Sequence, residues 1–286
     1  MSPERLAMSS MPARAGALAG VRIGLLERPH LPGHQGALVD RLTPALLSQG
    51  ADVQVVHAER GRHRLDVAPP WDVVVLKSGS AAALHVAAAA QAWGIPSVNS
   101  PAATRTAQDK LLVALMCQDA GLPVARSWAT WLDPAAAQEP TSLDEMPLVV
   151  KAVRGSQGSG IWPVEAGGLG ELRTRLPAGP YLVMEQVEHH GDDLKVYAAG
   201  DWMTAIERPF PARTLEAKLG RPVALPGEVA EATRAVGALV GLTCFGVDFV
   251  LGRDGWVMVD VNAFPGYKGA EGVVEALVAE IARSLP

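Results

Sequence analysis

Short apolar runs alternate with helix-length stretches over the first hundred residues. The first such stretch ends at Gly50, and glycine is favoured at helix C-termini. Strands that alternate with helices of about a dozen residues indicate βαβ units and a parallel sheet. The predicted strands span residues 21–26, 53–57, 71–76 and 95–98, and the predicted helices between them span 37–49 and 81–93.

The pattern changes in the second half of the chain, where short strand-like runs follow one another with turns between them. This pattern is typical of antiparallel sheets. The last two runs flank Asp254-Gly255, a strong signal for a hairpin turn. The predicted strands span residues 147–153, 161–164, 181–186, 194–199, 202–207, 244–251 and 256–261, and the predicted helices span 109–120, 226–240 and 272–285.

These two patterns predict a mixed fold, α/β in the first part and α+β in the rest. A chain of 286 residues is also longer than one hydrophobic core usually supports. We expect a disordered leader over residues 1–20, which are small and polar and lack the apolar stretch of a signal peptide. The predicted lobes are an N-terminal α/β lobe at 21–105, a central lobe at 106–190 and a C-terminal lobe at 191–286.

Composition excludes several classes of protein. The net charge is −5 and no run of lysine and arginine stands out, which argues against a nucleic-acid partner. The alanine-rich stretch 81–92 is too short to cross a membrane. Cys117 and Cys244 lie far apart in apolar surroundings, which predicts reduced thiols and a cytoplasmic protein. The oligomeric state, including a homo-oligomer, is left open.

A glycine-rich loop follows the apolar strand that ends at Lys151. The loop contains Ser156, Gly158 and Ser159, and such residues let backbone N–H groups approach a phosphate closely. It is not a Walker A loop, because no Gly-Lys-Ser/Thr ends it and a strand follows instead of a helix. The loop is therefore predicted to cap a hairpin and to cover nucleotide phosphates, although an ordinary mobile turn fits the same residues.

A second group of candidate residues lies on the C-terminal hairpin. Asp260 and Asn262 are two residues apart on one strand and so share a face, and Asp248 on the preceding strand can lie opposite them. Two carboxylates and an amide oxygen suit Mg²⁺. Buried like charges need such a cation, whereas solvated acids at strand ends would not.

Six segments, taken in order, resemble the ATP-grasp superfamily and, within it, the RimK-like carboxylate–amine ligases. The resemblance covers nearly the whole chain and implies an ATP-grasp fold with ATP and Mg²⁺ as cofactors. The segments are Ile95–Pro101, Asp109–Leu111, Ala120–Pro123, Lys151–Gly160, Glu185–Val187 together with Gly191–Val196, and Phe245–Asp248 together with Val259–Gly266.

The resemblance also implies a role for each matching residue. Lys110 and Lys151, with the loop residues Ser156, Gly158 and Ser159, would contact the ATP phosphates. Glu185 and the backbone of Gln186 and Val187 would hold adenine, and Glu188 and Asp193 are candidates for ribose. Asp248, Asp260 and Asn262 would hold Mg²⁺, while Lys195 and Arg208 would face the transferred phosphoryl group or the acceptor.

The chain departs from the ligase pattern at three places. Lys195 and Asp260 stand where such ligases more often carry arginine and glutamate, and the Arg-x-Asn segment expected after Arg208 is absent. The stretch Asp260–Gly269 is moreover similar to the C-terminal loop of ATP-grasp inositol polyphosphate kinases.

Three functions consequently remain. One is an amide-forming ligase that joins a small carboxylate and an amine through an acylphosphate. Another is a kinase that phosphorylates a small alcohol, and the third is a nucleotide-binding protein without turnover. The earlier segments favour the ligase, and the intact acids and lysines argue against loss of turnover.

Overall fold

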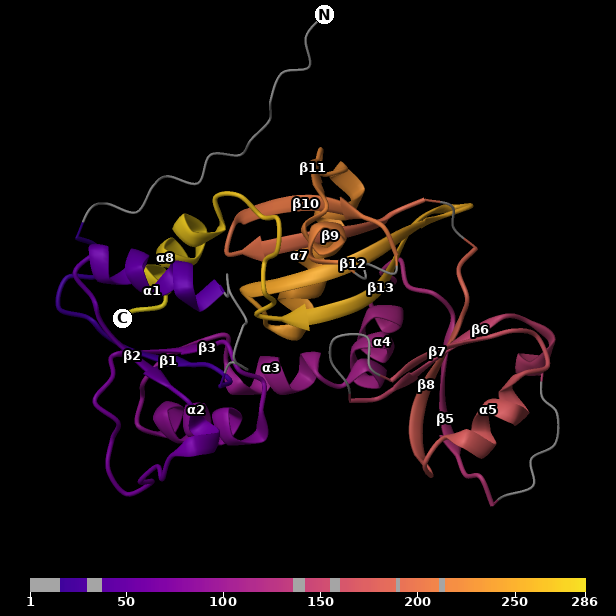
Figure 1. Ribbon diagram of the computed structural model, residues 1–286, viewed down its shortest axis with the longest axis horizontal. Helices are drawn as coiled ribbons and strands as arrows, with labels where there is room; N and C mark the ends of the chain where they lie inside the picture. The colour runs from indigo at the N-terminus through magenta and orange to yellow at the C-terminus, as the bar shows by residue number, and fades with distance from the viewer. Residues whose placement is uncertain (1–15, 30–37, 136–141, 155–159, 189–190, 211–213) are drawn as a thin grey trace, which may run out of the picture.

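A computed structural model describes residues 16–29, 38–135, 142–154, 160–188, 191–210 and 214–286. Three sheets lie side by side along the long axis of the molecule, with the N-terminal lobe at one end and the central lobe at the other (Figure 1). The sheet between them, which we call the middle sheet, is built from the last five strands. The predicted mixed fold, with a parallel sheet first and antiparallel sheets after it, is confirmed.

The N-terminal lobe contains a four-stranded parallel sheet of order β2-β1-β3-β4. Its two inner strands, β1 and β3, are almost entirely buried because helices cover both faces of the sheet (Figure 1). The C-terminal helix packs beside the first helix, in an apolar core that also includes residues of the middle sheet. The elements are β1 (Arg22–Leu26), α1 (Leu38–Ser48), β2 (Asp52–Val56), η1 (Ala58–Arg60), β3 (Val73–Leu76), α2 (Ala81–Ala92), β4 (Ser97–Val98) and α8 (Val273–Arg283).

The central lobe contains a four-stranded antiparallel sheet of order β5-β8-β6-β7, with one helix packed against it. Two of its strands, β6 and β7, pair antiparallel, and residues 155–159 of the glycine-rich loop between them lie outside the described residues. The elements are β5 (Ser127–Leu132), η2 (Ser142–Glu145), β6 (Leu148–Ala152), β7 (Ile161–Val164), α5 (Leu169–Arg175) and β8 (Gly179–Glu185).

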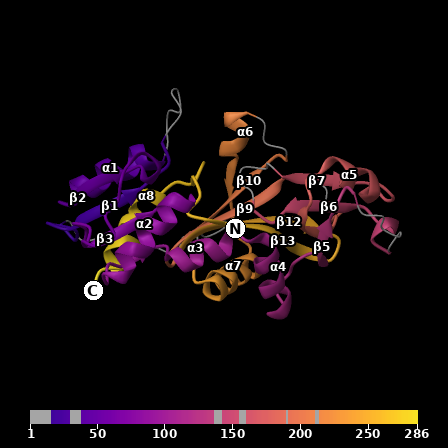
Figure 2. The ribbon, with the colours of Figure 1, turned by 90° about the horizontal axis from the view of Figure 1, so that it is seen from below.

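The middle sheet has the order β11-β10-β9-β12-β13 and is antiparallel throughout. Three helices, α3, α4 and α7, cover one of its faces and enclose a large apolar core, whereas the short helix α6 stands on the other side (Figure 2). The elements are α3 (Pro101–Ala107), α4 (Lys110–Asp119), β9 (Asp193–Ala199), β10 (Trp202–Arg208), α6 (Leu215–Leu219), β11 (Arg221–Val223), α7 (Gly227–Val240), β12 (Cys244–Gly252) and β13 (Gly255–Ala263).

Local side-chain caps define where the helices near the site begin. Ser100 Oγ accepts a hydrogen bond from Ala103 N at 3.0 Å, and Pro101 occupies the first helical position of α3. Asp109 Oδ1 accepts from Leu112 N at 3.0 Å and starts α4. This cap places Lys110 at the first position of its helix.

A buried asparagine joins the N-terminal lobe to the middle sheet. Asn99 donates from Nδ2 to Cys244 O at 2.7 Å, and its Oδ1 accepts from Thr243 N at 2.9 Å and Cys244 N at 2.8 Å. The side chain is 2% exposed, so these bonds replace water for three backbone groups. The Asn-Ser-Pro segment, which is one of the segments that resemble ATP-grasp ligases, therefore also has a structural role.

Several elements were not predicted from the sequence: α3, β5, α5, α6 and β11. The ordered lobe also begins before residue 21, because residues 16–20 form turns and Leu18 is fully buried in the core of the N-terminal lobe. The rest of the predicted leader lies outside the described residues. Among the helices that the structure describes, none is long and apolar enough to cross a membrane.

Candidate active site

A β-bulge in the C-terminal hairpin sets which side chains face one another. Phe249 on β12 pairs with Met258 on β13, but the next pair is Asp248 with Asp260. Val259 is thus an extra residue on β13. Because directly paired residues lie on the same face of an antiparallel sheet, Asp248 and Asp260 point to the same side. That side is opposite the face covered by α3, α4 and α7, since Phe249 and Met258 lie in the core beneath those helices.

Asn262 completes the group that the sequence predicts for metal binding. Its Nδ2 donates to Asp260 Oδ2 at 3.1 Å and to Asp248 Oδ2 at 3.3 Å. The amide therefore bridges the two carboxylates. A half-turn of that amide would present its oxygen in place of its nitrogen, and the three residues would then offer only oxygen donors.

Two cations from the neighbouring strands neutralise Asp248. Lys195 on β9 is the ladder partner of Asp248, and its Nζ donates to both carboxylate oxygens at 2.7 Å. Arg208 at the end of β10 donates to Oδ1 at 3.1 Å. The Lys195 and Asp248 side chains are 8% and 12% exposed, so this pair is largely shielded from water. Lys195 and Arg208, the two residues predicted to face the acceptor, thus both contact Asp248, a predicted Mg²⁺ ligand.

Asp260 receives its counter-charge from the helix that begins at Lys110. Lys110 Nζ donates to Asp260 Oδ1, and the backbone N–H of Lys110 bonds to Val153 O at 3.0 Å, at the end of β6. Burial opposes ionisation of Asp260, but the charges of Lys110 and Lys151 outweigh it and hold the pKa of this carboxyl below its ordinary value.

Lys151, the other predicted phosphate contact, reaches the bulge from the central lobe. Its Nζ donates to Val259 O at 2.6 Å. The side chain is buried, and the loss of water lowers the pKa of its ammonium group even though Asp260 lies nearby. Lys110 and Lys151 thus converge on neighbouring atoms of β13.

The combined cluster suits a polyanion with a divalent cation. Three carboxylates stand against four basic groups, so positive charge is in excess; the third carboxylate is Asp193, which lies opposite Arg208 in the β9–β10 ladder. A triphosphate would offset that excess, and the carboxylate and amide oxygens are the hard donors that Mg²⁺ prefers. Within the described part of the chain, no three Asp, Glu, His and Cys side chains form a metal cluster, so the amide of Asn262 is needed as a third donor.

The residues predicted to hold adenine and ribose lie along the edge between the central lobe and the middle sheet. Glu185 at the end of β8 pairs with Arg126 at 2.8 Å. The backbone N–H of Gln186 already bonds to Pro147 O at 3.0 Å, so only its carbonyl is available to a base. Val187 packs in a small apolar cluster with Val257.

The two ribose candidates lie in different environments. Glu188 is exposed and pairs with Arg253 of the hairpin turn at 3.5 Å. Asp193 is buried at the start of β9, on the same face as Lys195. Ser156, Gly158 and Ser159, the predicted loop contacts, lie outside the described residues.

A cavity of about 30 Å³ opens between α4, β6, β8 and β13 beside the two lysines. Its lining is mainly apolar, and its volume is about that needed by a single water molecule, far below that of a ligand pocket. The lining includes Lys110, Lys151, Leu182, Met184, Met258 and Val259.

Sequence reasoning missed two participants. The first is the carbonyl of Val259, which no side-chain pattern could reveal because its role comes from the bulge. The second is Tyr197, whose ring lies 5.8 Å from Lys195 Nζ. Burial raises the pKa of Tyr197 to about 12 and keeps the hydroxyl protonated. Alternation along β9 from Lys195 was the available signal for Tyr197.

Curated proteins similar to this chain are ligases. A probable α-L-glutamate ligase from Thioalkalivibrio sulfidiphilus is 29% identical over 265 residues, covering 81% of this chain and 85% of that protein. A probable α-L-glutamate ligase from Sodalis glossinidius is 29% identical over 284 residues, covering 94% and 93%. No protein-family model matches the chain.

Solved structures of ATP-grasp proteins share the fold. The RimK-domain ATP-grasp protein from Sphaerobacter thermophilus superposes with a TM-score of 0.69 at 18% identity, over 92% of this chain and 99% of that one. The ATP-grasp ligase PsnB, complexed with a minimal precursor, gives 0.65 at 23% identity, over 91% and 99%. D-alanine–D-alanine ligase from Bacillus anthracis gives 0.69 at 15% identity, over 93% and 97%. The chain therefore has the ATP-grasp fold and is similar over most of its length to probable α-L-glutamate ligases.

Proposed function

We propose that this protein is an ATP-dependent carboxylate–amine ligase. The observation that carries the proposal is the convergence of Lys110 and Lys151 on the strand that bears Asp260 and Asn262, with Asp248 directly opposite. Support comes also from relatives named as ligases over most of the chain. The expected site therefore lies where the middle sheet meets the central lobe.

The residues divide into two groups by what they would contact. Lys110 and Lys151 would orient the triphosphate, and Asp248, Asp260 and Asn262 would hold Mg²⁺. The bound ion would neutralise charge on the phosphate oxygens. Lys195 and Arg208, on the far side of Asp248, would face the carboxylate that takes the phosphoryl group and would stabilise its negative charge.

The chemistry balances in two steps. A carboxylate oxygen attacks the γ-phosphorus, the bond to the β-γ bridging oxygen breaks, and ADP leaves. The amine nitrogen then attacks the acyl carbon, the C–O bond to phosphate breaks, and the nitrogen loses a proton. The products are an amide, ADP and inorganic phosphate.

The decisive assay measures ADP and inorganic phosphate with Mg-ATP and a panel of carboxylates and amines. A ligase releases phosphate only when an amine and a carboxylate are both present. ADP formation with the phosphoryl group retained on an alcohol would instead support the kinase alternative. Tight binding of ATP without formation of ADP under any of these conditions would support the alternative of a nucleotide-binding protein without turnover.

Asp260→Asn tests the metal assignment. The change keeps the shape of the side chain but removes the charge, so turnover should fall at least about a hundredfold. Circular dichroism should show an unchanged fold. Near-native turnover in this variant would contradict the assignment.

A further inference from the structure

A hydrogen bond links the N-terminal lobe to the junction between α3 and α4. Gln108 donates from Nε2 to Gly79 O at 2.5 Å. Gly79 lies in the loop between β3 and α2, and Gln108 directly precedes Asp109, whose side chain caps α4. A carbonyl oxygen only accepts hydrogen bonds, so the amide nitrogen of Gln108 must face this loop. The contact therefore lies two residues before Lys110 in the sequence.

The fit between Gly79 and Gln108 is close. A Cβ on Gly79 would lie 2.1 Å from Gln108 Nε2, far below van der Waals contact. Gly79 does not have a positive φ, so an alanine would not strain the backbone there. The clash would instead fall on the flexible end of the glutamine side chain. A methyl group at residue 79 would therefore displace the amide from the carbonyl.

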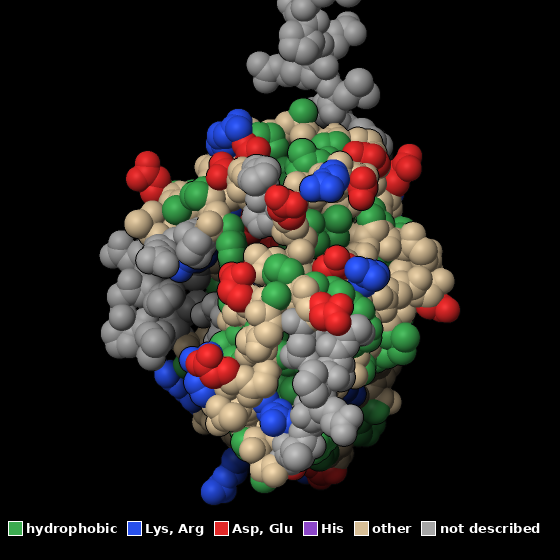
Figure 3. All heavy atoms as spheres, turned by 90° about the vertical axis from the view of Figure 1, so that its right-hand side faces the viewer, with side chains coloured by type: hydrophobic (Ala, Val, Ile, Leu, Met, Phe, Trp, Pro, Cys, Tyr) green, Lys and Arg blue, Asp and Glu red, His purple; other side chains and the backbone are tan. Residues whose placement is uncertain are grey.

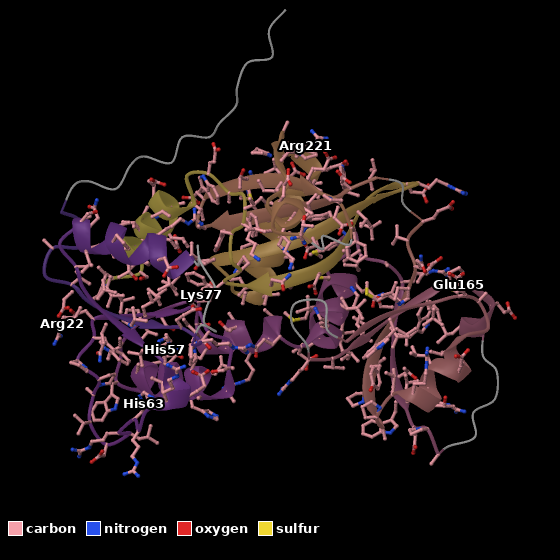
Figure 4. All side chains as sticks on the ribbon, in the orientation of Figure 1. Arg22, His57, His63, Lys77, Glu165 and Arg221 are labelled. Carbon is pink, nitrogen blue, oxygen red and sulfur yellow. The ribbon has the colours of Figure 1, made fainter. Side chains whose placement is uncertain are left out.

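The loop between β3 and α2 is fixed to the N-terminal sheet. It spans residues 77–80 and follows β3 directly. Ser78 is 3% exposed, and its backbone N–H donates to Leu26 O at 2.8 Å. Ser80 Oγ accepts a hydrogen bond from the backbone of α2 at 3.2 Å. Figure 4 shows Lys77 where the N-terminal lobe faces the middle sheet, so the loop is a firm support for a contact from α3.

Two further contacts hold Lys110. Its backbone N–H donates to Val153 O at 3.0 Å in the central lobe, and its Nζ donates to Asp260 Oδ1 on the middle sheet. The chain breaks its helical path just before this residue, because Asp109 has an extended backbone with φ of −95° and ψ of 94°. α3 and α4 are therefore not one rigid rod, although α3 leads from the N-terminal lobe to α4 (Figure 1). A shift of Gln108 would move Lys110 with it, since one residue separates them.

We propose that Gln108 is a positioning residue, which holds Lys110 in place for the nucleotide phosphates by linking the α3–α4 junction to the Gly79 carbonyl. Gln108 itself touches no phosphate in this assignment and acts through Lys110. The inference rests on the proposed function, because that function assigns Lys110 to the triphosphate. The N-terminal lobe would thereby take part in nucleotide binding, although ATP is expected where the middle sheet meets the central lobe.

Gln108→Met removes the donor and keeps a flexible side chain of similar length. Calorimetry measures the affinity of the full chain for a non-hydrolysable ATP analogue with Mg²⁺. The affinity should fall about fivefold, the effect of one hydrogen bond between neutral groups. Gly79→Ala perturbs the same contact from the N-terminal lobe and should cause a similar fall. Gln118→Met is the control, because Gln118 is an exposed glutamine of α4, and it should keep the full affinity.

A double-mutant cycle separates the positioning of Lys110 from a general effect on the structure. Lys110→Met alone should weaken binding of the analogue about tenfold or more, since it removes a charged donor. In that background Gln108→Met should change the affinity by less than about twofold. A purely structural effect would lower the affinity by the same factor with and without the lysine.

Full affinity in Gln108→Met or in Gly79→Ala would overturn the inference, and so would an equal fall with and without Lys110. If Gln108→Met does not fold, Gly79→Ala and its combination with Lys110→Met make the same test. If Lys110→Met binds the analogue as tightly as the unmodified protein, the proposed nucleotide site is wrong and both proposals fail. If Lys110→Met weakens binding and Gln108→Met does not, only the role of Gln108 is wrong.

Discussion

Lys195→Met tests the ion pair at the centre of the candidate site. The change keeps the length and apolar stem of the side chain but removes the charge that binds both oxygens of Asp248 at 2.7 Å. Breaking a buried pair by removing one partner costs about 3–5 kcal/mol. Arg208 and Asn262 still contact Asp248, so we expect a smaller loss of about 2 kcal/mol in the free energy of unfolding.

A double-mutant cycle separates the part of this loss in stability that comes from the ion pair from the part that comes from packing. Lys195→Met, Asp248→Asn and the combined variant are unfolded with urea and followed by tryptophan fluorescence. The coupling energy should be about 2 kcal/mol. A coupling below about 0.5 kcal/mol, the range of an exposed pair, would refute the reasoning.

Mg²⁺ provides a second readout of the same pair. If Lys195 neutralises Asp248 in the absence of a metal, the ion should raise the melting temperature of Lys195→Met more than that of the unmodified protein. The combined variant with Asp248→Asn should lose this gain. An equal gain in all three proteins would mean that the ion binds elsewhere.

Three further changes test other contacts. Asn99→Ala removes three hydrogen bonds to the backbone of Thr243 and Cys244 and should lower the free energy of unfolding in urea by about 3 kcal/mol. A loss below about 1 kcal/mol would mean that Asn99 does not stabilise the contact between the N-terminal lobe and the middle sheet. Burial raises the pKa of Glu280, so its charge opposes folding above its ordinary pKa. Glu280→Gln should therefore raise the melting temperature at about pH 8, and the gain should vanish near pH 4. Lys151→Met should weaken binding of an ATP analogue about tenfold or more by calorimetry, and unchanged affinity would remove Lys151 from the phosphate site.

The sequence predicts elements well where a local pattern defines them. The buried strands β1 and β3 are uninterrupted apolar runs, and the Asp254-Gly255 turn marks the hairpin of β12 and β13. Whether the remaining elements form depends on their tertiary contacts. β5 carries Trp131, which is 61% exposed, so burial of its ring does not account for the strand. The strand forms because β8 offers it an edge to pair with.

Contacts between elements far apart in the sequence could not be predicted from local sequence patterns. The C-terminal helix α8 was correctly predicted, but no local pattern indicates that its apolar face packs against α1 at the other end of the chain. On the face of the central lobe in Figure 3, the described acidic, basic and apolar side chains are interspersed.

The geometry of the candidate site depends on Val259, whose role no sequence pattern predicts. With the hairpin turn fixed and regular pairing throughout, Asp260 would lie opposite Val247, which is buried under α3, α4 and α7, and its charge would cost several kcal/mol there. The extra residue Val259 shifts the register by one, so Asp260 pairs with Asp248 on the open face. The carbonyl of that same residue receives Lys151 from the central lobe at 2.6 Å. A single bulge therefore aligns the carboxylates on one lobe and anchors the lysine of the other, which explains why the two groups meet at one point.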